Sequence, residues 1–134
     1  MEVKAFTENG RVPVTVMHVD GNIDSLTSEA FQAAANDSIA KGARHILVDL
    51  SHAKFVSSAG LRALHDVFNQ LRDLDPDTSM NDDDVRQGIS AGTYKSPHLK
   101  LLNLSPEARV GFETAGFDMF IQTFTDMKTA VASF

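Results

Sequence analysis

One short stretch constrains the fold of this chain more than any other. The segment "HILVDL", which ends at Leu50, is a nearly continuous apolar run, typical of a central strand that is covered on both faces. Apolar residues at helical spacing follow from Leu61 to Leu74. Two adjacent hydroxyls, Ser57 and Ser58, lie between these segments. The sequence therefore predicts a buried strand, a short loop and an amphipathic helix, with both serines where the helix begins.

Strand and helix patterns also alternate on the N-terminal side of this stretch. Residues 12–19 alternate apolar and polar side chains, and a weaker strand pattern precedes the "NG" turn before them, so a hairpin is expected. A helix follows, for which Thr27 is the predicted N-cap and Leu26 and Phe31 the predicted hydrophobic staple. Gly42 supplies a left-handed end to this helix.

The C-terminal part continues the alternation. "LKLLNL" predicts another strand, and "SPE", from Ser105, places a cap, a first-turn proline and a first-turn acid before a helix that Gly116 closes. "MFIQTF" predicts a last short strand, and Thr125 or Asp126 opens a C-terminal helix. Strands and helices that alternate in this way predict an α/β fold with helices packed on a mixed sheet.

The length of the chain predicts one domain with one interruption. Its 134 residues suit a single compact domain over residues 1–134. The segment 75–97 is rich in Asp, Ser, Gly and Pro and is too long for an ordinary connection. We expect an acidic, mobile surface loop there.

The charge of the chain is concentrated in that region. The net charge is -6, and six aspartates lie within residues 73–84, which contain no Lys or Arg. The remaining residues carry equal numbers of acidic and basic side chains. No basic stripe is present for a phosphate backbone, so no nucleic-acid partner is expected.

The sequence predicts a cytoplasmic protein that does not insert into a membrane. The N-terminus lacks a basic region followed by an apolar core, and no apolar run approaches the roughly 18 residues that span a bilayer. Cysteine is absent, which excludes disulfides and thiolate catalysis and is compatible with a reducing compartment.

The two serines form only half of a catalytic motif. The nucleophile elbow G-x-S-x-G is matched by Ser58 and Gly60, but Val56 stands at its first glycine. His65 lies two helical turns further on, about 10 Å away, too far to act as a base for Ser58 within one helix. We therefore expect no enzyme activity.

No metal or cofactor site is expected either. The five histidines have no metal-binding spacing, and no cysteine is available as a ligand. Asp73, Asp75, Asp77 and Asp84 fall at positions 1, 3, 5 and 12 of a calcium-loop register. However, Thr78 stands where the sharp turn needs glycine, and position 12 lacks the longer glutamate.

The serines fit two structural roles at the start of a helix. One of them could cap the helix. An exposed hydroxyl there could also accept a phosphate, because free backbone N–H groups and the helix dipole favour an anion. A phosphate would add nearly two negative charges to a surface that a partner could cover. From the residues alone, both roles remain open.

The stretch "VDLSHAKFVSSAGLRAL" resembles the signature of STAS domains, the family of bacterial anti-sigma factor antagonists. The resemblance extends to "GNID", to "LLNLSPEARVGFETAGF" and to the closing "FTDMKTAVASF". It implies a STAS-like fold, with a four- to five-stranded mixed sheet and about four helices packed mainly on one side. It also implies a protein without catalytic activity of its own.

The resemblance further implies a regulated contact surface. Alignment on Gly60 places the phosphorylated serine of the family at Ser58, and the acidic residue of a "G-x-L-D" stretch at Asp24. Ser57 replaces the usual Asp before the phosphoserine, and so is an alternative acceptor. With Leu61, these residues are the predicted surface for an anti-sigma factor, often itself the serine kinase, which would bind the unphosphorylated form and be released on phosphorylation.

Two other functions remain open within the same resemblance. The chain could be a STAS subunit that is never phosphorylated and serves a transporter or another assembly. It could also be a sensor that binds a small molecule or nucleotide at the helix N-terminus. The sequence does not predict the oligomeric state.

Overall fold

The computed structural model describes residues 2–74 and 95–134, and the structural statements below refer to these residues. A five-stranded sheet has the order β1-β2-β3-β4-β5. The strands are β1 (Glu2–Asn9), β2 (Pro13–Asp20), β3 (Ile46–His52), β4 (Leu99–Leu102) and β5 (Thr123–Phe124). β1 and β2 form the predicted antiparallel hairpin, whereas β2 to β5 are parallel. The sheet is therefore mixed, as the sequence predicts.

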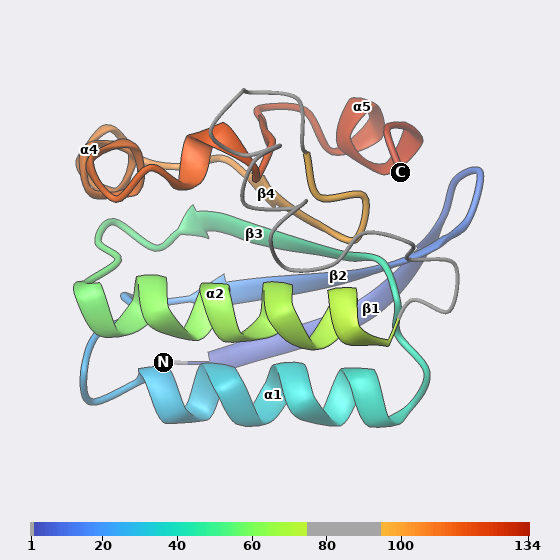
Figure 1. Cartoon of the computed structure of the whole chain (residues 1–134), viewed down its shortest axis with the longest axis horizontal. Coiled ribbons are helices and arrows are strands. Elements are labelled where there is room, and N and C mark those ends of the chain that lie inside the picture. The colour runs from blue at the N-terminus through green and yellow to red at the C-terminus, as the bar shows by residue number, and fades with distance from the viewer. Residues whose placement is uncertain (1, 75–94) are drawn as a thin grey trace.

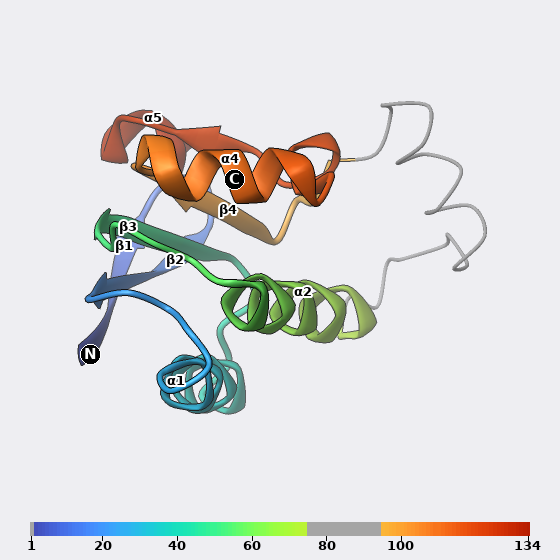
Figure 2. The ribbon, with the colours of Figure 1, turned by 90° about the vertical axis from the view of Figure 1, so that its left-hand side faces the viewer.

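Helices cover both faces of this sheet, but unequally. They are α1 (Ser28–Ala40), α2 (Ser58–Asp73), α4 (Pro106–Thr114) and α5 (Met127–Ala132), with a short 3-10 helix, η1 (Phe117–Met119). The larger hydrophobic cluster joins the sheet to α1, α2 and α4, and the smaller one joins its other face to α5. Figure 1 and Figure 2 show α1 and α2 side by side, away from α5. The prediction that helices pack mainly on one side is confirmed.

The two faces explain the apolar run at the start of β3. Ile46 and Val48 pack in the larger cluster, whereas Leu47 points to the opposite face and packs in the α5 cluster. All three side chains are fully buried. Successive side chains of a strand point to opposite faces, so a strand covered on both sides needs apolar residues at consecutive positions.

Most of the predicted helix ends are confirmed. Ser105 caps α4 by accepting a hydrogen bond from the Ala108 N–H at 3.0 Å. Asp126, one of the two predicted candidates, caps α5. Gly42 and Gly116 follow α1 and α4 with φ angles of 106° and 80°, as the left-handed ends require.

Thr27 is the N-cap residue of α1, as predicted, but its side chain does not cap the helix. Its hydroxyl donates instead to the Asn22 carbonyl at 2.7 Å. The Asp24 carboxylate stabilises the turn before the helix, accepting from the N–H groups of Leu26 and Thr27 at 2.9 and 3.1 Å. This turn directs Leu26 outward with 90% of its surface exposed, so it forms no hydrophobic staple with the buried Phe31.

Two further predictions concern the region between α2 and the C-terminus. The predicted acidic loop at 75–97 lies outside the described residues except for its last three. Of these, Lys95 donates to the Met119 carbonyl at 2.6 Å, and the Ser96 N–H to the Phe120 carbonyl at 2.7 Å. The strand predicted from "MFIQTF" is shorter than expected, because Met119 ends η1 and only Thr123–Phe124 pair with β4.

Candidate functional site

Backbone pairing brings two distant loops together where α2 begins. After β3 ends, Val56 forms a parallel bridge with Ile23, in the loop that follows β2. The Ile23 N–H donates to the Phe55 carbonyl at 3.1 Å, and the Ser57 N–H to the Ile23 carbonyl at 2.8 Å. The loop containing Asp24 therefore lies alongside the entry to α2, and the predicted site residues from both loops meet.

The two serines have different positions at this entry. Ser57 is the N-cap, with extended backbone angles (φ -78°, ψ 176°), and its Oγ accepts the Gly60 N–H at 3.3 Å. Ser58 is the first residue of α2 and is exposed. Its hydroxyl forms no hydrogen bond with any part of the chain that the structure describes. The residue that caps α2 is therefore Ser57, and the residue with the unbonded hydroxyl is Ser58.

Two backbone donors beside this hydroxyl also lack a partner in the described part of the chain. Of the N–H groups at the start of α2, that of Ser57 is bonded to Ile23 and that of Gly60 to the Ser57 side chain. The N–H groups of Ser58 and Ala59 have no partner within the described ranges. Together with the helix dipole, such free donors favour an anion at this position.

Gly60 and Leu61 lie beneath the surface rather than on it. A Cβ atom at Gly60 would approach the Ile23 carbonyl oxygen and Val56 Cγ1 to 2.8 Å each, so only glycine allows this close contact. Leu61 is 8% exposed and packs in the larger core. Both residues hold α2 against the two loops, and the accessible residues of the predicted site are Asp24, Ser57 and Ser58.

Asp24 combines a structural role with a stable negative charge. The Leu26 N–H, assisted by the hydroxyl and N–H of Thr27, lowers the pKa of the Asp24 carboxyl below its usual value. Asp24 therefore remains ionised at neutral pH while it fixes the loop beside Ser57.

Two exposed apolar side chains flank the site and were not among the predicted site residues. Leu26 is 90% exposed and Phe55 50% exposed. Phe55 is held in place by its N–H, which donates to Asn22 Oδ1 at 3.0 Å. Contiguous apolar area rimmed by polar residues is typical of protein-contact surfaces. The aromatic before the serines was visible in the sequence motif, but the exposure of Leu26 was hidden by its predicted role as a staple.

A second polar cluster lies on the sheet face opposite α1 and α2. His18 Nδ1 lies 2.9 Å from Asp49 Oδ2, and His18 Nε2 lies 3.1 Å from His52 Nδ1. Burial opposes ionisation of Asp49, but hydrogen bonds from His18 and Ser51 outweigh it and lower the Asp49 pKa. Within residues 2–74 and 95–134, no three such side chains are placed to bind a metal ion.

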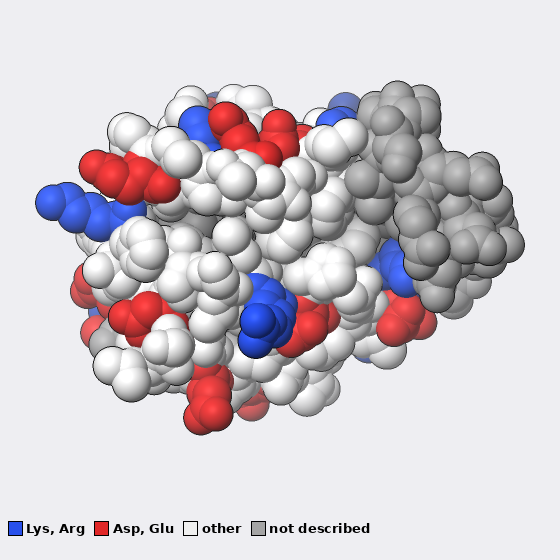
Figure 3. All heavy atoms as spheres, turned by 60° about the vertical axis from the view of Figure 1, so that its left-hand side comes forward, with Lys and Arg blue, Asp and Glu red and all other residues white. Residues whose placement is uncertain are grey.

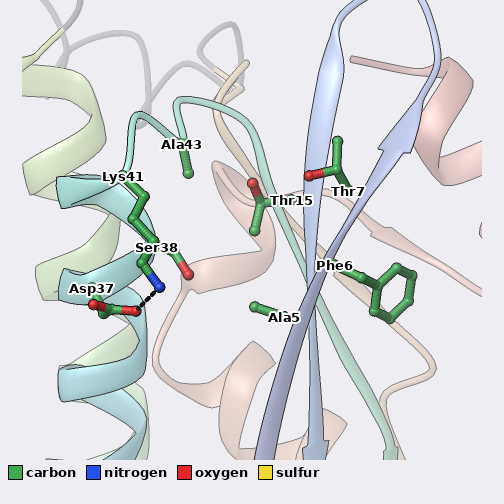
Figure 4. A pocket seen from close by; sticks show the side chains of 8 residues that line it. All are labelled: Ala5, Phe6, Thr7, Thr15, Asp37, Ser38, Lys41 and Ala43. Carbon is green, nitrogen blue, oxygen red and sulfur yellow. Dashed lines mark ion pairs between the residues drawn. The ribbon is translucent and has the colours of Figure 1, made fainter.

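A pocket elsewhere in the molecule lacks the features of a reactive site. It lies between the β1–β2 hairpin and the end of α1, and Figure 4 shows Thr7 and Thr15 facing α1 across it. Its charged groups, Lys41 and Asp37, pair with each other at 3.0 Å. The pocket adjoins the C-terminal end of α1, whereas the loop that contains Asp24 precedes the first turn of this helix. The pocket is therefore separate from the site at the start of α2. None of the described helices is long and apolar enough to cross a membrane.

The chain is similar to known proteins over most of its length. BtrV of Bordetella bronchiseptica, named as an anti-sigma factor antagonist, is 28% identical over 116 residues, covering 87% of this chain and 82% of BtrV. An anti-sigma factor antagonist from Mycobacterium paratuberculosis superposes with a TM-score of 0.67 at 18% identity, covering 98% of this chain and 93% of its own. The phosphorylated form of Bacillus SpoIIAA gives a TM-score of 0.61 at 17% identity, with coverage of 97% and 96%.

The two structural similarities show that the chain shares the fold of these proteins. The family model described as the STAS domain matches residues 4–77, which is more than half of the chain and includes both loops of the site. The chain therefore belongs to the STAS domain family.

Proposed function

We propose that this protein is an anti-sigma factor antagonist whose binding to an anti-sigma factor is switched by phosphorylation of Ser58. The observation that carries the proposal is the separation of the two serines: Ser57 caps α2, whereas the Ser58 hydroxyl is exposed and unbonded among the described residues. The similarity to BtrV, a protein named for this activity, supports the same function.

The proposed contact surface surrounds the free hydroxyl. Asp24 and Ser57 lie beside it, and Leu26 and Phe55 add exposed apolar area. Aromatic residues are enriched at the centre of protein interfaces, where a few side chains supply most of the binding energy, and the rim is polar. The surface thus suits a protein partner, and the chain would act by binding rather than by catalysis.

Phosphorylation would change this surface without disturbing the fold. A phosphate on Ser58 would lie beside the unpaired N–H groups of Ser58 and Ala59 and at the positive end of α2. It would also place a strongly hydrated dianion next to Leu26 and Phe55, which a partner must desolvate. The fold tolerates the phosphate, but the partner does not. In this proposal the partner is an anti-sigma factor with serine kinase activity, and both proteins act in the cytoplasm.

The proposal predicts a single phosphorylated residue. When the purified protein is incubated with its partner kinase and ATP, mass spectrometry is expected to find one phosphate, on Ser58. Ser58→Ala should abolish it. Ser57→Ala, the matched control one residue away, should retain it. A phosphate on Ser57 in the unaltered protein would contradict the assignment.

Binding provides the second part of the test. Ser58→Asp is expected to weaken binding to the anti-sigma factor at least tenfold in calorimetry, while circular dichroism and the melting temperature stay nearly unchanged. Equal affinity of the phosphorylated and unphosphorylated proteins would refute the switch and favour a STAS subunit that serves another assembly without phosphorylation.

A further inference from the structure

A cation lies one helical turn after the proposed phosphorylation site. Arg62 follows Ser58 by four residues in α2, and both are exposed. Side chains four residues apart on a helix are neighbours, with Cβ atoms about 6 Å apart. A phosphate on Ser58 therefore comes within reach of the Arg62 guanidinium by rotation of side chains alone.

Arg62 has no ion pair among the described residues. It lines a groove between α1 and α2 with Glu29 and Asp66, yet neither carboxylate lies within 4.0 Å of its guanidinium. Figure 3, which brings forward the end at which α1 and α2 begin, shows Lys and Arg sparse on this side of the molecule and interspersed with Asp and Glu. Arg62 is thus available to a new anion.

Ser57 places a neutral residue immediately before Ser58, so within the chain at this entry no second negative charge is added to that of Asp24 in the adjoining loop. As a neutral N-cap, it satisfies the Gly60 N–H through its hydroxyl. An aspartate in its place could cap the helix equally well, but it would repel a phosphate on the adjacent residue. The entry to α2 therefore combines free N–H groups, a neutral cap and a cation one turn away.

We propose that Arg62 holds the phosphate of phosphorylated Ser58 within the same helix. This inference rests on the proposed phosphorylation of Ser58. Guanidinium binds phosphate through charge-assisted hydrogen bonds, with two N–H groups directed at two oxygens. As Arg62 turns toward the phosphate, its guanidinium moves away from Glu29 and Asp66, which line the same groove. Phosphorylation then changes the groove between α1 and α2 as well as the surface at Ser58.

The test uses a protein that carries phosphoserine at position 58 by incorporation during synthesis, so no kinase is required. Phosphorus NMR then measures the second pKa of the phosphate. Because the Arg62 cation stabilises the dianion, this pKa is expected to be about 0.3 pH units lower in the unaltered phosphoprotein than in Arg62→Gln, the shift that an exposed ion pair of this spacing produces. Arg62→Lys should retain part of the shift.

Two further variants make the measurement specific. Arg11→Gln removes the same charge at the turn between β1 and β2 and should leave the phosphate pKa unchanged. Ser57→Asp should raise it. Equal pKa values in the unaltered phosphoprotein and in Arg62→Gln overturn the inference, as does an equal shift from Arg11→Gln.

The test of the Arg62 contact and the test of the proposed switch can give different outcomes. A lowered phosphate pKa with no effect of phosphate on partner binding would retain the Arg62 contact and refute the switch. An effect of the phosphate on partner binding without the pKa shift would retain the switch and refute the Arg62 contact. The melting temperature of unphosphorylated Arg62→Gln should equal that of the unaltered protein, because Arg62 makes no ion pair within the part of the chain that is described.

Discussion

Ser57 and Ser58 are chemically identical neighbours, but the backbone assigns them different tasks. The extended angles of Ser57 direct its hydroxyl back onto the first turn of α2, where it accepts the Gly60 N–H. Ser58 is already helical, and its exposed hydroxyl lacks such a partner among the described residues. One residue therefore stabilises the helix, and the other leaves its hydroxyl accessible.

This division predicts unequal costs for two matched substitutions. Ser57→Ala is expected to lower the free energy of unfolding by about 1 kcal/mol, the usual cost of a lost cap. Ser58→Ala should change it by less than about 0.5 kcal/mol, as is typical of an exposed site. Urea denaturation of both variants measures the difference. A larger loss from Ser58→Ala would mean that Ser58 supports the fold.

Helix α5 illustrates how one element depends on a single side chain of the sheet. Lys100 in β4 is largely buried, and its Nζ donates to the Ser133 carbonyl at 2.8 Å and to Ser133 Oγ at 3.0 Å. The same nitrogen lies 4.7 Å from the centre of the Phe134 ring. Burial lowers the pKa of Lys100, and these contacts compensate for its loss of water.

Removal of the Lys100 charge should therefore loosen α5. Lys100→Met keeps most of the apolar stem but leaves the Ser133 carbonyl without its donor. We expect amide hydrogen exchange in residues 127–134 to become about fivefold faster, corresponding to roughly 1 kcal/mol for the lost bonds. Lys128→Met, on the exposed side of the same helix, is the control and should have little effect. Equal exchange in the two variants would refute the role of Lys100.

At the scale of the whole molecule, Asp49 makes stability depend on pH. Its pKa is lowered in the folded protein, so the folded state binds fewer protons than the unfolded state in acid. Its contribution is therefore fully present above the unfolded pKa, near pH 4, and is lost as the pH falls through the lower folded value.

Asp49→Asn should reduce the free energy of unfolding at pH 7 by about 1 kcal/mol, because the hydrogen bonds to a charged acceptor weaken. It should also make the loss of stability below about pH 4 less steep. The slope will not vanish, since the pKa values of Asp24 and Asp126 are lowered as well. Urea midpoints between pH 2.5 and 7 give the comparison, with the exposed Asp66→Asn as control. Parallel pH curves for Asp49→Asn and the unaltered protein would contradict the assignment.

Local chemistry made much of this molecule predictable. The apolar run of β3, the left-handed glycines and the Ser105 cap each depend on nearby residues, so the sequence reveals them. The motif before α2 identified Ser57 and Ser58, but it did not say which of them caps the helix. That depends on the backbone angle at Ser57, which is fixed by its bond to Ile23, far away in sequence.

The remaining errors arise from tertiary contacts. Leu26 resembled a staple because its spacing from Phe31 was suitable, but the turn stabilised by Asp24 directs it into solvent. The strand predicted from Met119 begins only at Thr123, because Met119 ends η1 and the next residue, Phe120, packs against Phe117 with ring centroids 5.5 Å apart. Gly60 and Leu61 belong to the motif, yet their burial follows from the packing of α2 on a distant loop.

The separate positions of Ser57 and Ser58 also bear on how such a protein can change over generations. Because no described part of the fold uses the hydroxyl at position 58, a single codon change there can remove or restore this hydroxyl at almost no folding cost. Position 57 is constrained differently, because a replacement must still cap α2. Under the proposed phosphorylation of Ser58, regulation and stability can therefore be inherited and selected almost independently, although one peptide bond joins the two residues that carry them.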